Sequence, residues 1–413
     1  MNLRIFRSDK GDCMLLESED GRLVLVDGGM SSSMKKHVAP HLAALRDEGR
    51  ELDAIYVSHI DQDHISGVLA LLDAELDWRV FDANVARGDT SRGPDFPRPP
   101  PIKAIWHNAF HDQVEKNGGS ISSQIAASAP ILLATQNAGL TEAGLALRGI
   151  AASVDEALRV SRLIKGDLLD IPLNAIPGNK KRPKLLRAGA FKPFKIGSIT
   201  FKIIGPTDGE LKQLREGWNH WLKANPGKVK KIQDEMESNA DRIATWEGIG
   251  DFKGVTIPNI ASLTFMVEED GKRLLLTGDT QHDILMDGLR QAKYLTDDGP
   301  LHVEALKVQH HGAVANLDEN FARTVTADHY VFCGDGAHQN PEVEVLERIF
   351  NARMQDDTRP FTFWFSTSPV SEPETKRAAD FAHMAQEATK LQKKSGGRLT
   401  LRYNTHDFID LSI

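Results

Sequence analysis

Residues 57–67 read Val-Ser-His-Ile-Asp-Gln-Asp-His-Ile-Ser-Gly and place four candidate metal ligands within six residues: His59, Asp61, Asp63 and His64. The apolar run 54–57 before them predicts a buried strand, and the apolar run 67–72 after them predicts the start of a helix. The four groups are therefore expected on a strand-to-helix loop, where several side chains can converge on one point. Two imidazoles and two carboxylates form the mixed nitrogen and oxygen set that binds zinc, manganese or iron.

The composition is that of an ordinary soluble globular protein. The chain has 413 residues, 40% hydrophobic and 26% charged, with a formal net charge of −8. This charge argues against a protein coated in basic surface for non-specific nucleic-acid binding, although it leaves room for a local basic groove. Cys13 and Cys333 each lie in an apolar run and are expected to be buried thiols rather than a disulfide. No run approaches the length of a membrane span, and we expect a cytoplasmic protein without membrane contact.

Further ligand-type residues follow other apolar runs, each of which predicts a strand. Asp27 follows 23–26 and is followed by two glycines, which is typical of a residue that orients a metal loop, or that simply caps the turn. Later runs end in Asp279, in the pair His310 and His311, and in His338. Three such strand ends after a strong metal loop indicate a single site assembled from distant parts of the chain.

Two regions between the strands have a helical pattern. We expect a helical insertion over 112–185 and a second helical insertion or lid over 208–256, within a single domain that spans 1–413. The first ends in the basic loop 179–184, which is either solvated surface or a contact for an anionic substrate.

The sequence H-x-D-x-D-H at 59–64 resembles the H-x-H-x-D-H signature of the metallo-β-lactamase-fold hydrolases, with Asp61 in place of the middle His. This variant is similar to the hydrolase domain of the ComEC DNA-uptake proteins and to the phosphorylcholine esterases. The resemblance continues in 11–16, 25–29, 259–263, 274–279, 306–312 and 334–346. It implies an α/β fold, a four-layer αββα sandwich, into which the two helical insertions are placed.

The chain departs from this pattern at two further positions. Asn340 stands where the family's closing His is expected, and we expect His338 to take its place. Ala313 stands where the family has Ser after His-His-Gly. His107, which follows the apolar run 102–106, is an alternative ligand similar to the upstream His of ordinary metallo-β-lactamases.

The resemblance implies two divalent ions, Zn²⁺ or Mn²⁺, about 3.5–4 Å apart, which activate a hydroxide for attack. One ion would be held by His59, Asp61 and one of the pair His310 and His311, with His311 preferred; the other would be held by Asp63, His64 and His338, with Asp279 bridging. Asp63 would also orient or accept a proton, and His310 would donate a hydrogen bond to the transition state. Asp61 hardens the site, which makes manganese a rival to zinc.

The resulting hypothesis is a phosphodiesterase or nuclease acting on nucleic acid or nucleotides. One alternative is an esterase for small esters, lactones or phosphorylcholine-type groups. Another is a subunit or effector of a bacterial defence assembly, with the insertions as docking surfaces for a protein partner. A purely structural role is disfavoured because the ligand set is nearly complete.

Overall fold

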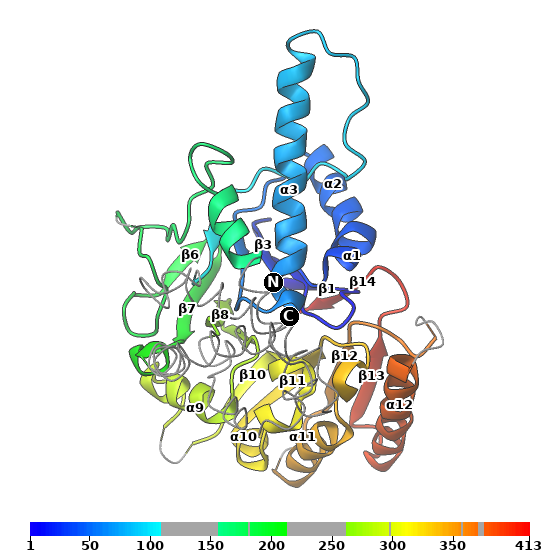
Figure 1. Cartoon of the computed structure of the whole chain (residues 1–413). Helices are drawn as coiled ribbons and strands as arrows, with labels where there is room; N and C mark the ends of the chain where they lie inside the picture. Colours follow the sequence, from blue (N-terminus) through cyan, green and yellow to red (C-terminus); the bar gives the residue numbers. More distant parts are fainter. Residues whose placement is uncertain (109–155, 181, 213–261, 297–298, 357, 371–375) are drawn as a thin grey trace, which may run out of the picture.

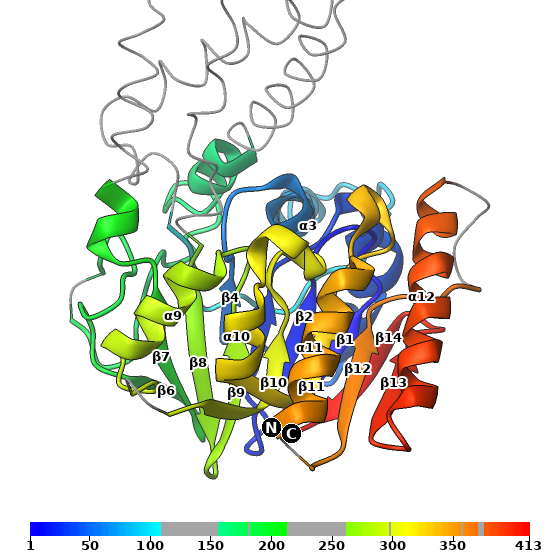
Figure 2. The ribbon, with the colours of Figure 1, turned by 90° about the horizontal axis from the view of Figure 1, so that it is seen from below.

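The computed structural model describes residues 1–108, 156–180, 182–212, 262–296, 299–356, 358–370 and 376–413. Two β-sheets pack face to face, and helices cover the outer face of each, as the two perpendicular views show (Figure 1, Figure 2). The predicted α/β sandwich with four αββα layers is confirmed by this arrangement.

The first sheet has six strands in the order β14-β1-β2-β3-β4-β5. Their bounds are Asn2–Phe6 (β1), Met14–Glu17 (β2), Leu23–Val26 (β3), Ala54–Tyr56 (β4), Ile105–Trp106 (β5) and Phe408–Ser412 (β14). β14 pairs antiparallel with β1, so both ends of the chain lie in this sheet. β3, β4 and β5 are parallel, which places their carboxyl ends at one edge.

The second sheet has eight strands in the order β13-β12-β11-β10-β9-β8-β7-β6. Their bounds are Phe194–Ile196 (β6), Ile199–Gly205 (β7), Thr264–Glu269 (β8), Lys272–Leu276 (β9), Leu301–Lys307 (β10), Val325–Phe332 (β11), Phe361–Phe365 (β12) and Leu399–Tyr403 (β13). The strands from β9 to β13 are parallel, whereas β6 to β9 form an antiparallel meander.

The helices divide between the two outer faces. Those on the first sheet are α1 (Ser31–Ser33), the π-helical turn η1 (Met34–Val38), α2 (Ala39–Asp47) and α3 (Gln62–Val85). Those on the second sheet are α9 (His282–Gln291), α10 (Glu319–Thr324), α11 (Val343–Asp356) and α12 (Lys376–Lys394). Short 3₁₀ turns are η6 (Gln309–Gly312), η7 (Val314–Asn316) and η8 (Ala337–Gln339), and residues 156–163 and 208–212 are also helical.

Side-chain alternation along the strands fills three hydrophobic layers. In β2, for example, Leu15 packs under the helices of the first sheet, whereas Met14 and Leu16 face the second sheet. Between the sheets, the ring of Phe265 lies 5.0 Å from that of Tyr56 and 5.8 Å from that of Trp106. These layers fix the two sheets against each other, and with them the two sets of strand ends.

Several sequence expectations can be compared with this fold. α3 begins at Gln62, not at Gly67, because the apolar face formed by Ile65, Val68 and Leu72 already starts in the metal loop. β6 and β14 were not expected. Cys13 and Cys333 are free and buried, as expected.

The two expected insertions fall mainly outside the described residues. Of 112–185, only the part from 156 onward is described, and of 208–256 only 208–212. The first of these parts contains helix 156–163, whose side chains pack into the hydrophobic layer between the helices and the first sheet. Within the described ranges, no helix combines the length and the apolar character that crossing a membrane requires.

Candidate metal centre

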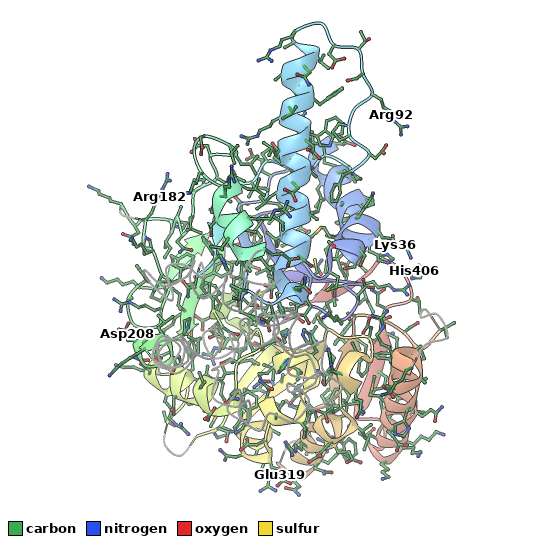
Figure 3. All side chains as sticks on the ribbon, viewed as in Figure 1. Lys36, Arg92, Arg182, Asp208, Glu319 and His406 are labelled. Atoms are coloured by element: carbon green, nitrogen blue, oxygen red, sulfur yellow. The ribbon has the colours of Figure 1, made fainter. Side chains whose placement is uncertain are left out.

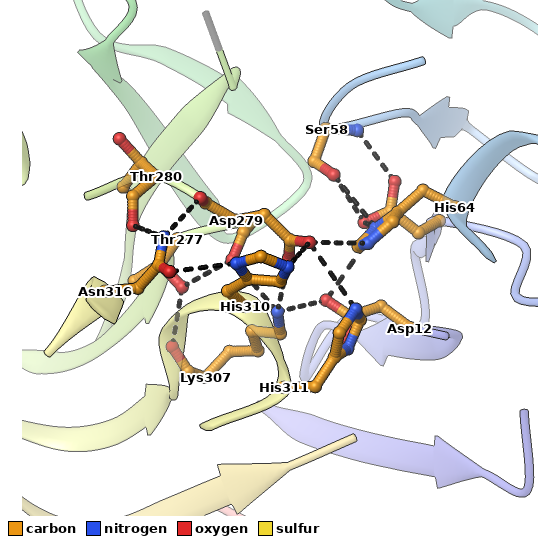
Figure 4. A network of polar contacts seen from close by, with 12 residues as sticks. Asp12, Ser58, His64, Thr277, Asp279, Thr280, Lys307, His310, His311 and Asn316 are labelled. Carbon is orange, nitrogen blue, oxygen red and sulfur yellow. Dashed lines mark hydrogen bonds and ion pairs between the residues drawn. The ribbon is translucent and has the colours of Figure 1, made fainter. Parts of the chain in front are cut away.

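Ligand-type side chains from both sheets meet at the edge formed by the carboxyl ends of the parallel strands. The first sheet contributes the segment after β3, the segment after β4 with the first turn of α3, and the β1–β2 turn. The second sheet contributes the segments after β9 and β10. Figure 4 shows these groups arranged around the carboxylate of Asp279. Asp279, His310 and His311, from two of the three expected strand ends, lie together with the metal loop here.

One oxygen of Asp279 faces four imidazoles. Its Oδ2 lies 3.3 Å from Nε2 of His64 and 3.4 Å from Nε2 of His311. It lies 3.6 Å from Nε2 of His59 and 3.8 Å from Nε2 of His310. In all four rings the same nitrogen, Nε2, is directed to this point.

The remaining nitrogen of two of these rings is fixed by Asp27 and Ser58. Asp27 accepts hydrogen bonds from the backbone N–H of Ser58 (2.7 Å) and from its hydroxyl (2.8 Å). It also accepts from Nδ1 of His64 at 3.0 Å, and the Ser58 hydroxyl lies 3.0 Å from Nδ1 of His59. With Nδ1 as the donor, Nε2 of each neutral ring carries the lone pair that binds a metal. Asp27 therefore orients the metal loop rather than capping a turn.

The other two rings are fixed in the same way by Asp12 and Asn316. Nδ1 of His311 donates to Asp12 at 3.0 Å, and Nδ1 of His310 donates to the Asn316 side-chain oxygen at 2.9 Å. The Asn316 amide donates to the backbone carbonyl of Asp279 at 3.0 Å, which identifies its Oδ1 as the acceptor. His310 is consequently a donor at Nε2 only when it is protonated.

The inner nitrogens form a site that fits a metal ion. Among the described residues, Nε2 of His59, His64 and His311 is buried and has no hydrogen-bond partner. Three orphaned nitrogens beside a carboxylate are costly unless a cation binds them. One ligand atom each from Asp12, His64, Asp279 and His311 lies within 4.8 Å of all the others.

The two carboxylates of the metal loop lie on different sides of this point. Oδ2 of Asp61 is 3.6 Å from Nε2 of His59, whereas Oδ2 of Asp63 is 3.4 Å from Nε2 of His311. The rings of His311 and His64 are 5.2 Å apart. His311 thus lies beside Asp63 and His64, and the ring of His64 is also 4.1 Å from that of His59, so the three rings form one continuous group. The assignment of His311 to the same ion as His59 and Asp61 stays a prediction.

A buried lysine neutralises part of this negative charge. Lys307, the last residue of β10, is 1% exposed. Its ammonium forms a very short contact with Asp12 Oδ2, lies 3.4 Å from Asp279 Oδ1 and donates to the carbonyl of Gly278 at 3.0 Å. Because Lys307 holds Oδ1 of Asp279, only Oδ2 of that carboxylate faces the imidazoles.

The electrostatics of the cluster are those of strongly coupled opposite charges. Burial opposes the charge of His64 and His311, yet the Asp279 carboxylate outweighs it and raises the pKa of both rings well above 6.5. Burial likewise opposes ionisation of Asp279, but the nearby imidazoles hold its pKa well below its usual range. Burial raises the pKa of Asp63, but the hydrogen bond from His311 and the charge of His64 lower it by more, so the pKa falls below its usual range.

Unusual backbone conformations aim the two adjacent imidazoles. His310 and His311 have φ values of 46° and 56°, in the left-handed region that non-glycine residues rarely adopt. Gly312 follows with φ 90°, and a Cβ there would lie 2.9 Å from Pro341. At the opposite side, a Cβ on Gly11 would lie 1.8 Å from the carbonyl oxygen of Asp63, so only glycine lets the β1–β2 turn approach the metal loop.

The closing segment places His338 and Asn340 in different environments. His338 is exposed on η8, and no described carboxylate or imidazole of the cluster contacts it. Asn340, at the position of the family's closing His, is buried, and its amide donates to the carbonyl of His310 at 3.3 Å. The closing segment therefore supports the backbone of His310, and the structure gives no support to His338 as a ligand.

His107 follows β5 and is buried at 1% exposure. Burial lowers its pKa to about 4, so the ring is neutral. Within the described chain, both ring nitrogens of His107 are buried without a hydrogen-bond partner, and the charge of His59 also lowers its pKa, so His107 lies close to the metal loop and stays a candidate ligand.

Sequence reasoning missed four residues that build the site: Asp12, Ser58, Lys307 and Asn316. Asp12 had a recognisable signal, since it follows a glycine at the start of a buried strand in the opening hairpin. Lys307 also had one, as a lysine within a run that otherwise reads as buried strand. Ser58 and Asn316 are small polar residues whose roles depend on distant partners.

Comparisons with known proteins give one family match, over part of the chain. Residues 8–75 match the family model of the metallo-beta-lactamase superfamily, a region that holds the opening hairpin, Asp27 and the metal loop. A comparison with the curated proteins finds no match. Among solved structures, the chain is similar to the crystal structure of a long form RNase Z from yeast, with a TM-score of 0.29 and 10% identity over 89% of this chain. The chain spans 36% of the length of that protein.

The layered fold, the matched region and the buried imidazole–carboxylate cluster define a metal-dependent hydrolase with the metallo-β-lactamase fold.

Proposed function

We propose that the chain is a metal-dependent phosphodiesterase that acts on nucleic acid or nucleotides, as the resemblance to the ComEC-type hydrolases implies. The observation that carries this proposal is the oxygen-rich ligand set, in which the carboxylates of Asp61, Asp63 and Asp279 surround three imidazoles. Hard oxygen ligands favour divalent ions such as Mn²⁺, which pair well with the oxygens of a phosphodiester.

The geometry supports two divalent ions, Mn²⁺ or Zn²⁺, that share Asp279. His59 and Asp61 would hold one of them, and Asp63, His64 and His311 would hold the other. When bound, such ions supply a nucleophile at neutral pH by lowering the pKa of water, and they offset the charge that develops on the phosphoryl group.

The protein's own residues orient the reaction. The pKa of Asp63 is lowered, so this carboxylate is ionised at neutral pH and acts as a ligand and hydrogen-bond acceptor. His310 is half-buried at the mouth of the cluster, with Nδ1 held by Asn316. As an imidazolium it would donate from Nε2 to a substrate oxygen, and as a neutral ring it would accept a proton there.

The test uses two substrates that separate the classes of hydrolase. Purified protein with Mn²⁺ or Zn²⁺ is assayed on bis(p-nitrophenyl) phosphate and on p-nitrophenyl butyrate, a carboxylic ester. A phosphodiesterase hydrolyses the first, and Asp63→Ala removes that activity. Asp77→Ala, an exposed carboxylate on the same helix, is the matched control and should keep it.

Turnover of the butyrate ester alone would replace the proposal by the esterase alternative. A wild type that binds metal and hydrolyses neither compound would favour the remaining hypothesis, a subunit of a larger assembly.

A further inference from the structure

A second candidate site lies between helix 156–163 and the chain that follows it to residue 184. A pocket of about 640 Å³ opens there, lined by residues of 158–173 and 182–184. This volume falls within the roughly 300–1,000 Å³ range of ligand-binding sites. Figure 3 labels Arg182 at the edge of the molecule beside this helix.

The rim of the pocket carries a concentration of positive charge. Arg162, Lys165, Arg182 and Lys184 line it together with a single carboxylate, Asp170. All four basic side chains are exposed, and within the described part of the chain none of them forms an ion pair. In a protein of net charge −8, four unpaired cations around one cavity mark it as an anion site.

The floor of the same pocket is apolar. It is formed by aliphatic side chains, among which Ile164 is 6% and Ile171 is 4% exposed. A basic rim over an apolar floor fits a ligand with a phosphate at one end and a flat, poorly hydrated group at the other. A nucleotide with an unpaired base has this chemistry, whereas a base in a duplex does not expose its face.

The pocket is attached to the metal loop. The side chain of Gln62, between the two ligand carboxylates of the loop, donates to Glu156 at 3.3 Å, and Arg159 pairs with Asp73 on α3 at 2.9 Å. The helix that carries the pocket lies beside α3 in both views (Figure 1, Figure 2). These two contacts hold the helix that carries the pocket against the start and the side of α3.

We propose that this pocket binds a nucleotide unit of a single-stranded nucleic acid, with its phosphate on the basic rim and its base against the aliphatic floor. The proposal rests on the proposed function, since it extends the substrate from a simple phosphodiester to a strand. It assigns the pocket to substrate recognition and leaves hydrolysis to the metal centre.

The test compares two variants with the same change in charge. One replaces Arg162, Lys165, Arg182 and Lys184 by Gln. The other replaces Lys390, Lys393, Lys394 and Arg402 by Gln, four exposed basic residues on α12 and β13 at the other side of the molecule. The ligand is a fluorescent oligothymidylate of twelve nucleotides with a hydrolysis-resistant phosphorothioate backbone. Its binding is measured by fluorescence anisotropy at several salt concentrations. Hydrolysis of bis(p-nitrophenyl) phosphate reports separately on the metal centre and on folding.

We expect the pocket variant to lose at least about tenfold in affinity. The slope of log K against log salt concentration should become shallower by about 0.7 for each phosphate contact that is lost. The α12 variant should bind as the wild type does, and both variants should hydrolyse the small substrate normally. The single variant Arg182→Gln, at an exposed position, should lose about two- to fivefold in affinity. It provides the test if the variant with four substitutions does not fold.

Equal losses of affinity in the two variants with four substitutions, or a wild type that does not bind the strand, would overturn the pocket proposal. Failure of the wild type to hydrolyse bis(p-nitrophenyl) phosphate would instead count against the proposed function, and the binding measurement would still decide the pocket.

Discussion

Replacing Lys307 by Met removes a buried cation while keeping an unbranched side chain of similar shape. The ammonium of Lys307 is enclosed with the carboxylates of Asp12 and Asp279, and all three side chains are at most 2% exposed. Removing one partner of a buried ion pair costs about 3–5 kcal/mol, because the remaining charges lose their compensation. For a 413-residue chain that unfolds cooperatively, the entropy of about 2.1 cal/mol/K per residue converts this loss to a decrease in Tm of about 3–6 °C.

The assay is thermal unfolding of the metal-free protein in a chelating buffer, followed by circular dichroism. The matched control is Lys103→Met, because Lys103 also contacts two carboxylates, Glu51 at 2.8 Å and Asp53 at 3.1 Å. Its side chain is 42% exposed, so solvent screens the pair and the loss should stay below about 1 kcal/mol. Added Mn²⁺ should recover part of the deficit of Lys307→Met, since a divalent ion bound to Asp279 supplies positive charge to the same cluster.

The reasoning would be refuted by a Lys307→Met protein whose Tm equals that of the wild type or of Lys103→Met. Such a result would mean that water or a rearranged side chain replaces the ammonium without cost.

Three further changes probe the cluster and its backbone. His311→Ala should lower bound Mn²⁺ or Zn²⁺ in elemental analysis, whereas His338→Ala should leave the metal content unchanged; a loss in the second variant would restore His338 as a ligand. Metal affinity, measured by calorimetry, should rise from pH 6 to pH 8, because the pKa values of His64 and His311 lie well above 6.5 and their protons must leave before metal binds. An affinity that is independent of pH would contradict this protonation state. Gly312→Ala should destabilise the protein by about 1–3 kcal/mol in urea unfolding, because φ is 90° and the new Cβ would lie 2.9 Å from Pro341; unchanged stability would show that the turn relaxes.

The metal loop illustrates what local sequence can and cannot predict. Its ligand types and the preceding strand were predictable, because the residue types and the apolar run are both local. The start of α3 was placed five residues too late, since the ligands Asp63 and His64 lie within the first helical turn. Polar residues at a helix start look like loop residues until the packing of Ile65 against the core is known.

The closing segment shows a choice between two nearby residues that local sequence could not make. Asn340 stands where the family's closing His is expected, and the sequence offered His338, two positions earlier, as its replacement. The structure exposes His338 and buries Asn340 against the backbone of His310. Local spacing could not decide this, because the direction of each side chain depends on how the turn packs against η6.

The sequence by itself determined the candidate ligand types and the strand ends that carry them, because periodicity and residue type are properties of short segments, and the motif resemblance implied the α/β class. Only the tertiary structure decided which atoms share a site. It joined Asp12 from the first hairpin to Lys307 from β10, and it paired His311 with Asp63 and His64. These contacts form between two sheets, and their geometry follows from the packing of the sheets' inner faces, which no short segment specifies.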